Sequence, residues 1–372
     1  MKRVVFILLF FLYQPLFADI IEIKPNDETS GFGNSVDIYE NYVIFGAPGD
    51  DDNGNNTGAA YIFKYENGKW IQQAKLFAND GNLNHSFGDS VSISSQYATV
   101  KGSSYNSDKT LIINRIYIFK KEENRWTFCD KLYEDIKASV SGDYVIAVSK
   151  FNKIFLYKLE SSGYTLLDQI EFKGSVSSVD ISNENIIIGL SNYSNHSSVI
   201  RFYKIINEKL ELNNIFSSSD STAYGNYTSI FNNTAIASAN GFAFVFSGDG
   251  SYWNKVYEIQ NSGQVAASDN MVICNGTIVK NIDNEWIEYA RFSLPDVYNN
   301  YALSNDHLIV GHFEISNLNM MFITGTIKDI NDEGLQNINF NVHSPGEISY
   351  QIFPSDSNGI YKSFFFLDGQ GQ

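Results

Sequence analysis

The chain has 372 residues, with 26 Lys and Arg against 42 Asp and Glu, so its formal net charge at pH 7 is −16. Such an acidic chain lacks the basic surface that neutralises phosphates, which argues against nucleic acid and against anionic membranes as partners. Hydrophobic residues make up 43% and aromatic residues 15% of the sequence, too much for a disordered chain. The length allows one large or two ordinary domains.

The first eighteen residues have the pattern of a secretory signal. Lys2 and Arg3 precede an apolar run over 4–13, Pro15 ends it, and Ala18 offers a cleavage site. The alternative is a buried first strand. No other apolar run approaches the ~20 residues of a membrane span, so we expect a protein that is not transmembrane. The sequence therefore predicts a secreted, extracellular or cell-surface protein, with the periplasm as the bacterial possibility.

One pattern recurs along residues 19–322. An apolar residue closes a strand rich in Ser and Val, a short turn follows, and a second apolar run comes next. The copies lie about 36 to 55 residues apart, the length of a unit of four short strands. The seven apolar residues, which we call the anchors, are Ile38, Ile93, Val140, Ile181, Ile230, Ala267 and Leu303.

Each of the first six copies continues with a third strand and with a fourth that often carries Trp, as at Trp70, Trp126 and Trp253. The seventh copy lacks its fourth strand, which residues 20–24 could supply. The expected fold is all-β: a seven-bladed β-propeller over 19–322, closed by the N-terminal strand. The aromatic side chains would fill the spaces between blades.

Residues 31–76 resemble the FG-GAP repeat of integrin-α-like propellers. The resemblance rests on Phe-Gly-Asn-Ser-Val at 32–36, Gly-Ala-Pro at 46–48 and a Gly-rich loop that leads into 58–63. The second copy keeps Phe-Gly at 87–88, and the later copies keep only the spacing. The resemblance independently implies a seven-bladed propeller, and it implies a role in extracellular recognition or cell adhesion.

Calcium is where the sequence departs from that family. The family's calcium-binding copies insert an Asp-rich loop between the first two strands, whereas this chain has only the turn 39–41 there. Another acidic group lies after Gly-Ala-Pro, in the loop that joins the second strand to the third. One interpretation is a surface calcium site with Asp50, Asp52 and Asn55 as ligands. The other is a solvated acidic turn that binds no metal.

The two cysteines give a geometric prediction. Cys129 falls in the outer strand of the second unit and Cys274 in the second strand of the sixth. Units so far apart in a ring cannot bring two Cα atoms within about 7 Å, so we expect two free thiols. A disulfide between them would instead overturn the assignment of the units.

Residues 323–372 differ from the repeats. Strand-like runs joined by Asp, Asn and Gly resemble the start of a carboxypeptidase-regulatory-like, or prealbumin-like, β-sandwich. Too few strands fit for a complete module, so we expect an incomplete β-sandwich-like segment and a chain that belongs to a longer multi-module protein.

No catalytic motif stands out. The five His residues are scattered, and Gly-x-Ser-x-Gly, Walker and dinucleotide patterns are missing. We expect no cofactor apart from the calcium alternative. Two functions stay open: a non-enzymatic recognition or adhesion module that binds an extracellular protein or polysaccharide through propeller loops, and a polysaccharide hydrolase or lyase with an axial active site. Axial Asp, His, Arg and Tyr would favour the enzyme, whereas Ser, Asn and Ala would favour the binder.

Overall fold

The computed structural model describes most of the repeat region. The described residues are 23–27, 29–80, 85–105, 112–123, 125–133, 135–149, 151–161, 163–193, 197–217, 224–291, 300–305, 307–311, 318–326 and 360–368. The predicted signal at 1–18 lies outside these ranges. Across them, no helix has the length and apolar character needed to cross a membrane.

Six four-stranded antiparallel sheets and one two-stranded sheet follow one another over residues 35–311, and strands are joined to their nearest neighbours in sequence. The first three sheets consist of β1 Ser35–Tyr39, β2 Tyr42–Ala47, β3 Ala59–Glu66 and β4 Lys69–Leu76; β5 Ser90–Ile93, β6 Tyr97–Tyr105, β7 Ile112–Glu122 and β8 Arg125–Tyr133; and β9 Asp135–Ser141, β10 Tyr144–Ser149, β11 Lys153–Glu160 and β12 Gly163–Glu171.

The remaining four sheets of the repeat region continue the pattern. They consist of β13 Ser175–Ser182, β14 Asn185–Tyr193, β15 Ser197–Ile206 and β16 Lys209–Ser217; β17 Tyr224–Phe231, β18 Thr234–Ala239, β19 Ala243–Gly248 and β20 Trp253–Ile259; β21 Val265–Ala267, β22 Met271–Cys274, β23 Thr277–Ile282 and β24 Glu285–Arg291; and β25 Asn300–Leu303 with β26 Leu308–Gly311. We number these sheets one to seven.

Every anchor lies in the first strand of its sheet, as the repeat pattern predicted. The second strands of sheets one to six are mostly buried, because the apolar residues of neighbouring sheets face each other. Separate apolar clusters join sheets one and two, two and three, three and four, four and five, and five and six. The core is therefore divided among the interfaces between sheets, which is how thin sheets become stable together.

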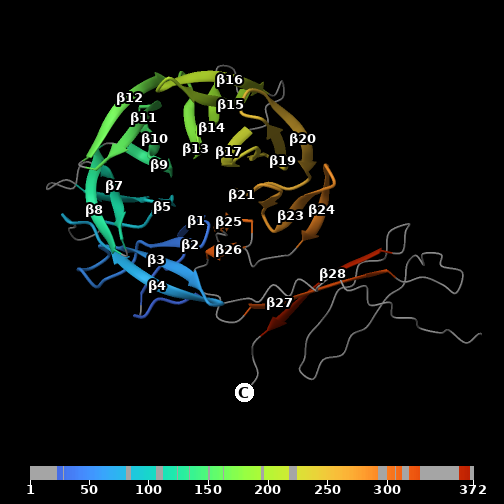
Figure 1. The fold of residues 1–372 in the computed structure, drawn as a ribbon, viewed down its shortest axis with the longest axis horizontal. Coiled ribbons are helices and arrows are strands. Elements are labelled where there is room, and N and C mark those ends of the chain that lie inside the picture. The colour runs from blue at the N-terminus through green and yellow to red at the C-terminus, as the bar shows by residue number, and fades with distance from the viewer. Residues whose placement is uncertain are drawn as a thin grey trace, which may run out of the picture. The chain divides into compact units, whose positions relative to one another are not determined.

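Figure 1 shows these sheets arranged around a ring, with the first strands innermost. Strand β25 packs against both β1 and β21, so sheet seven lies between sheets six and one. The amide of Asn300 donates to the main-chain oxygen of Asn34, and the His307 ring lies 4.6 Å from the Tyr65 ring and 5.2 Å from the Trp70 ring. The repeated sheets are consistent with propeller blades, six of four strands and a seventh of two described strands.

The two faces of this ring carry different connections. Tight turns join the first strand to the second and the third to the fourth, and Asn or Asp adopts positive φ in many of them, as at Asn183 and Asn232. The connections from second to third strands and from each sheet to the next lie on the opposite face, because the strands are antiparallel. They include the longest ones, 48–58 and 77–89. We call the two faces the turn face and the loop face.

The predicted closing strand is not confirmed. Residues 20–22 lie outside the described ranges, and Ile23 and Lys24 are described but form no strand. Strand β27, Leu318–Thr326, crosses the expected boundary at 322 and pairs with β28, Ile360–Asp368, in a sheet of its own. These two strands belong to a separate compact unit of the chain. The β-sandwich-like module therefore stays a prediction.

The cysteine prediction is confirmed. Cys129 lies in β8, the outer strand of sheet two, and Cys274 lies in β22, the second strand of sheet six. Both are free thiols. The thiol of Cys274 is fully buried, and burial raises its pKa to about 12, so it packs as a small apolar group.

Candidate functional site: an acidic cluster and an axial polar ring

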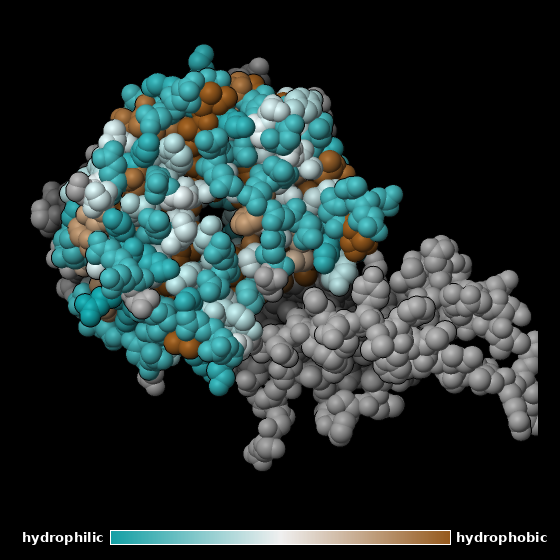
Figure 2. All heavy atoms as spheres, in the orientation of Figure 1, coloured by the Kyte–Doolittle hydropathy of each residue, from teal (hydrophilic) through white to brown (hydrophobic). Residues whose placement is uncertain are grey.

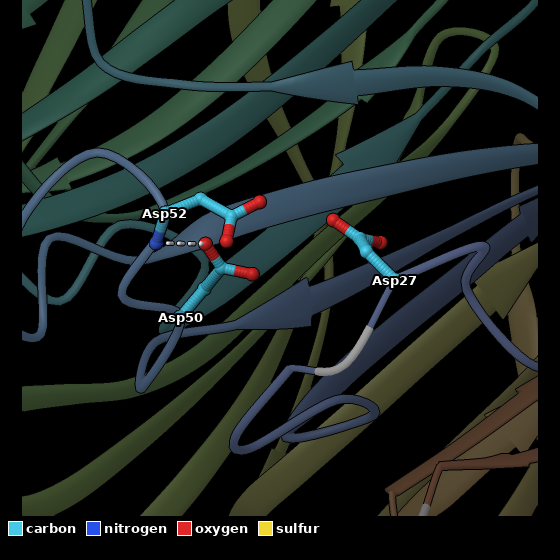
Figure 3. Close-up of side chains that lie close together, drawn as sticks. All are labelled: Asp27, Asp50 and Asp52. Atoms are coloured by element: carbon cyan, nitrogen blue, oxygen red, sulfur yellow. Dashed lines mark hydrogen bonds between the residues drawn. The ribbon is translucent and has the colours of Figure 1, made fainter.

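The loop between β2 and β3 turns the Asp50 side chain inward. Asp50 is fully buried, and its carboxylate accepts hydrogen bonds from Thr29 Oγ1 at 2.6 Å, Tyr61 OH at 2.7 Å and the Asp52 main-chain N–H at 3.2 Å. Oxygen atoms of Asp27, Asp50 and Asp52 lie within 4.8 Å of one another. Figure 3 shows the three carboxylates close together, two from the loop and one from the segment before β1.

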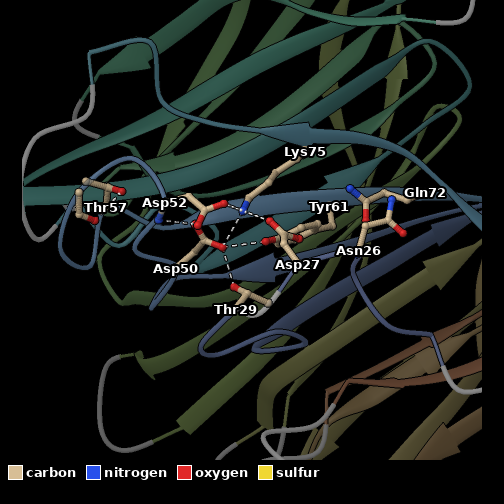
Figure 4. Close-up of polar contacts among 10 residues, drawn as sticks. Asn26, Asp27, Thr29, Asp50, Asp52, Thr57, Tyr61, Gln72 and Lys75 are labelled. Carbon is tan, nitrogen blue, oxygen red and sulfur yellow. Dashed lines mark hydrogen bonds and ion pairs between the residues drawn. The ribbon is translucent and has the colours of Figure 1, made fainter.

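A cation from the protein itself contacts all three carboxylates. Lys75, in β4, places Nζ 2.5 Å from Asp27 Oδ2, 3.0 Å from Asp50 Oδ2 and 2.5 Å from Asp52 Oδ2 (Figure 4). The same ammonium lies 5.0 Å from the centre of the Tyr61 ring. Lys75 therefore supplies positive charge at the point on which the carboxylates converge, and buried carboxylates need such compensation.

Hydrogen bonding decides the protonation states of this cluster. Burial alone would raise the pKa of Asp50, but the hydrogen bonds from Thr29, Tyr61 and Lys75 outweigh it and the pKa is lowered. Burial alone would lower the pKa of Lys75, yet its hydrogen bonds to Asp27 and Asp52 raise it well above the ordinary value. Both groups are therefore charged at neutral pH.

The sequence prediction named part of this cluster. Asp50 and Asp52 do come together, whereas Asn55 lies exposed at the tip of the loop, where its side-chain oxygen accepts from Asn56 Nδ2 at 2.8 Å. Sequence reasoning missed Asp27 and Lys75, which are far from the loop in sequence. Calcium binding stays a prediction, and the carboxylates suit calcium chemically, but Lys75 already balances part of their charge.

Sheet two has an equivalent network. Tyr117 OH donates to Asp80 Oδ1 at 2.7 Å, and Lys131 Nζ lies 2.6 Å from Asp80 Oδ2. Tyr117 and Lys131 hold the same places in β7 and β8 as Tyr61 and Lys75 in β3 and β4. Fully buried His85 lies beside them, with Nε2 3.0 Å from Tyr117 OH. In sheet two the network joins Asp80, in the segment before β5, to the outer half of the sheet. In sheet one Tyr61 contacts Asp50 of the β2–β3 loop, and Lys75 pairs with Asp27 of the segment before β1.

A second polar group surrounds the axis of the ring, where Figure 2 shows an opening. It is formed by the residue before each anchor, a place that we call the axial position. The seven axial residues are Asp37, Ser92, Ser139, Asp180, Ser229, Ala266 and Ala302. The residues around the axis were expected to distinguish the two functions that the sequence left open. They are mainly Ser and Ala, together with two Asp.

Axial side chains accept hydrogen bonds from the next sheet. Such a bond satisfies a main-chain N–H on the inner edge of a first strand, which no further strand covers. The donors and acceptors are Ile93 N–H to Asp37 Oδ2 at 2.8 Å, Val140 N–H to Ser92 Oγ at 3.1 Å, Ile230 N–H to Asp180 Oδ2 at 2.9 Å and Ala267 N–H to Ser229 Oγ at 3.2 Å.

The two axial carboxylates influence each other. Burial and the charge of Asp180 raise the pKa of Asp37 to about 7, against which its hydrogen bonds from Ile93 and Ser92 act. Burial also raises the pKa of Asp180, opposed by hydrogen bonds from Ser139, Ile230 and Ile181. Asp37 therefore changes its protonation near neutral pH, although its carboxylate is fully engaged with the main chain.

Glycine contacts explain the Phe-Gly and Gly-Ala-Pro motifs. A Cβ added to Gly46 would lie 1.9 Å from the main-chain oxygen of Gly88 in the next sheet. The same contact recurs between sheets four and five, where a Cβ on Gly189 would lie 1.9 Å from Gly225 O. Later copies therefore keep more than the spacing of the motif, since one of them keeps this pair of glycines.

The comparisons agree with the motif. The FG-GAP repeat family model matches residues 23–63 and 70–119, so this part of the chain carries FG-GAP repeats. Together with the ring of repeated four-stranded sheets, this match is consistent with a β-propeller. No curated protein sequence matches the chain.

Solved structures with a similar course of the chain have low sequence identity. A protein from Lactobacillus plantarum is 9% identical at a TM-score of 0.48, with 71% of this chain and 85% of that chain covered. Saccharomyces cerevisiae Sqt1 is 11% identical at a TM-score of 0.46, with 92% and 98% covered. Hsv2 from Kluyvelomyces marxianus is 15% identical at a TM-score of 0.44, with 69% and 83% covered.

Proposed function

We propose that the chain is a non-enzymatic recognition or adhesion module of the cell surface or extracellular space, which binds a protein or a glycan through its loop face. The observation that carries the proposal is the inequality of the two faces. The turn face is built of short connections, whereas the loop face holds the longest connections. Loops on a rigid scaffold are the usual place for binding residues.

Exposed aromatic side chains on the loop face support this proposal. Tyr133 ends β8 and is 59% exposed, and Phe151 lies between β10 and β11 and is 61% exposed. Large aromatic groups at the surface bind partners well, since they bury much area for little loss of conformational entropy. The FG-GAP repeats also favour an extracellular setting, because such repeats are typical of cell-surface proteins.

One observation favours the alternative, an enzyme with an axial active site that cleaves polysaccharides. Glycosidases use two carboxyl groups, one with a raised pKa, and Asp37 and Asp180 are two carboxyl groups near the axis. Both, however, accept hydrogen bonds from main-chain N–H groups of the next sheet. That engagement gives each carboxylate a structural role, so the recognition module remains our proposal.

Capture of partners on an array tests the proposal. The full chain is applied to an array of extracellular matrix proteins and glycans, beside a Tyr133→Ala, Phe151→Ala double variant. We expect the double variant to lose capture. A Tyr252→Ala variant is the matched control, since Tyr252 is 57% exposed but lies in the β19–β20 connection on the turn face. Equal loss in both variants would contradict binding through the loop face, as would polysaccharide cleavage that Asp37→Asn abolishes.

A further inference from the structure

A groove opens at the perimeter, between the outer parts of sheets five and six. Its volume is about 560 Å³, within the ~300–1,000 Å³ that small-molecule sites have. The side chains that form it come from β19, β20, β23, the β23–β24 turn and the start of β24. The lining residues are Ser247, Val256, Asn281, Asn284, Glu285 and Trp286.

The repeat pattern explains why the groove is open here. Trp286 is the second residue of its outer strand, the place that Trp70 and Trp126 hold in sheets one and two. Each of those two rings contacts an aromatic ring of the preceding sheet, four residues after that sheet's anchor: Trp126 lies 6.4 Å from Tyr42, and Trp70 lies 5.2 Å from His307.

Sheet five has a small residue at this place. Thr234 stands four residues after the anchor Ile230, and its hydroxyl donates to Asp269 O at 2.6 Å. Trp286 packs against the apolar cluster between sheets five and six, yet among the described residues it has no aromatic partner. The Trp286 ring therefore has a surface that faces the groove, whereas the corresponding surfaces of Trp70 and Trp126 contact an aromatic ring of the preceding sheet.

The other lining residues complete an amphipathic wall. Val256 is the extra residue of a β-bulge, because Val245 pairs with Tyr257 and Phe246 with Lys255, and it is 40% exposed. A bulge re-aims a side chain in this way. The polar side chains of Asn281, Asn284 and Glu285 have no hydrogen-bond or ion-pair partner within the described ranges, and Ser247 has none either.

We propose that this groove binds a neutral saccharide, with a sugar ring stacked on Trp286 and its hydroxyl groups bonded to Asn281, Asn284, Glu285 and Ser247. Sugar C–H groups suit the negative face of an aromatic ring, a carboxamide can donate to and accept from neighbouring hydroxyl groups, and a carboxylate accepts from them. The one charged lining residue is Glu285, an acid, so an anionic sugar would be repelled. The inference rests on the proposed recognition function and specifies a glycan site outside the loop face.

Titration of the full chain with cellotetraose, xylotetraose, mannotetraose and the acidic tetragalacturonate, followed by tryptophan fluorescence and calorimetry, tests the inference. We expect at least one neutral probe to bind and tetragalacturonate not to bind. Asn281→Ala and Trp286→Ala should each weaken binding at least about tenfold, the effect of losing ~1.4 kcal/mol. Trp286→Phe, which keeps a ring, should retain most of the affinity.

Trp126→Ala is the matched control, since it truncates the equivalent Trp of sheet two and leaves the groove intact. Thermal melting of each variant separates lost binding from lost folding, and Asn281→Ala keeps the test valid if Trp286→Ala does not fold. Failure of all neutral probes, preference for tetragalacturonate, or equal loss in Trp126→Ala would overturn the inference. Binding of a neutral probe that only the Tyr133→Ala, Phe151→Ala variant loses would overturn the groove but retain recognition through the loop face.

Discussion

The same two positions carry a Tyr and a Lys in sheets one and two, but their acidic neighbours differ. The residues are Tyr61 and Lys75 in sheet one, and Tyr117 and Lys131 in sheet two. In both sheets the Tyr hydroxyl donates to an Asp, and the Lys ammonium pairs with it. Sheet one gathers three carboxylates around its Lys, whereas Asp80 is the carboxylate that pairs with Lys131 in the described residues. Because three carboxylates surround the Lys75 ammonium, a substitution of Lys75 tests the calcium interpretation.

Replacing Lys75 by Met should destabilise the protein by about 2 kcal/mol, because three carboxylates then lack their shared cation and Asp50 is fully buried. Calcium should raise the melting temperature of Lys75→Met, since carboxylate oxygens are its preferred ligands. Calcium should leave the wild-type melting temperature unchanged. Scanning calorimetry with and without calcium measures both effects.

Lys131→Met is the control for this prediction. Asp80 is 36% exposed and alone in pairing with Lys131 among the described residues, so the loss of stability should be smaller and calcium should not restore it. Equal stabilisation of the wild type and Lys75→Met by calcium would instead support a metal site that tolerates the ammonium.

Asp37 predicts a pH dependence. Its pKa rises from 3.8 to about 7 on folding, so the folded state binds the proton more tightly than the unfolded chain. The stabilisation by this group is full below pH 3.8 and is lost as the pH rises through about 7. Asp37→Asn, which keeps an acceptor for Ile93 N–H, should match the wild type near pH 4 and exceed it in melting temperature at pH 8. A stability difference that does not change with pH would contradict the raised pKa.

At the scale of the strands, the repeat pattern predicted the position of the first strand in every sheet. All seven anchors lie in first strands, because an apolar residue before a polar turn and a second apolar run is a local signal. Cys129 and Cys274 also lie in the strands assigned to them. The glycine pair of sheets four and five was missed, since Gly189 and Gly225 stand without the Phe and Ala-Pro neighbours that mark the motif in the first copies.

That glycine contact makes a steric prediction. Gly46→Ala and Gly189→Ala should each cost at least about 3 kcal/mol, because the new Cβ would meet a main-chain oxygen of the next sheet at 1.9 Å. Gly68→Ala is the control, because Gly68 has φ +78° but its new methyl would meet no atom within 4 Å, and it should cost only about 1 kcal/mol. Urea unfolding measures the three values, and similar costs would show that the close approach is relieved by movement of the sheets.

The acidic cluster shows what a local pattern cannot reach. Asp50 and Asp52 were found because they are adjacent in a loop, but Asp27 and Lys75 join them only through the fold. Likewise, the axial residues look like ordinary strand residues in the sequence. Only the ring arrangement shows that Ser92 and Ser229 accept hydrogen bonds from main-chain N–H groups of the next sheet. Partners that are brought together by tertiary structure carry no signal at short spacing.

At the scale of the whole ring, axial hydrogen bonds join some pairs of successive sheets and are missing from others in the described residues. Asp37, Ser92, Asp180 and Ser229 each accept from the following sheet, and Asp37 and Asp180 also accept from Ile38 and Ile181, the anchors of their own sheets. Six of the seven anchors thus have an acceptor for the N–H. Ala266 and Ala302 offer none, so within the described residues no axial side chain joins sheet six to sheet seven or sheet seven to sheet one.

Leu303 is the anchor left over, and it allows a stabilising substitution. Ser304 N–H donates to His307 O, so the alternation of an antiparallel pair turns the Leu303 N–H away from β26, and it has no acceptor in the described residues. Ala266→Ser should supply one, as Ser229 does for Ala267, and should raise the free energy of unfolding by about 1 kcal/mol. Ala302→Ser is the matched control, because Asp37 already bonds the Ile38 N–H that it would face. Urea unfolding should show a gain in the first variant alone; a gain in both would mean that the added hydroxyl acts elsewhere than at the unbonded anchor.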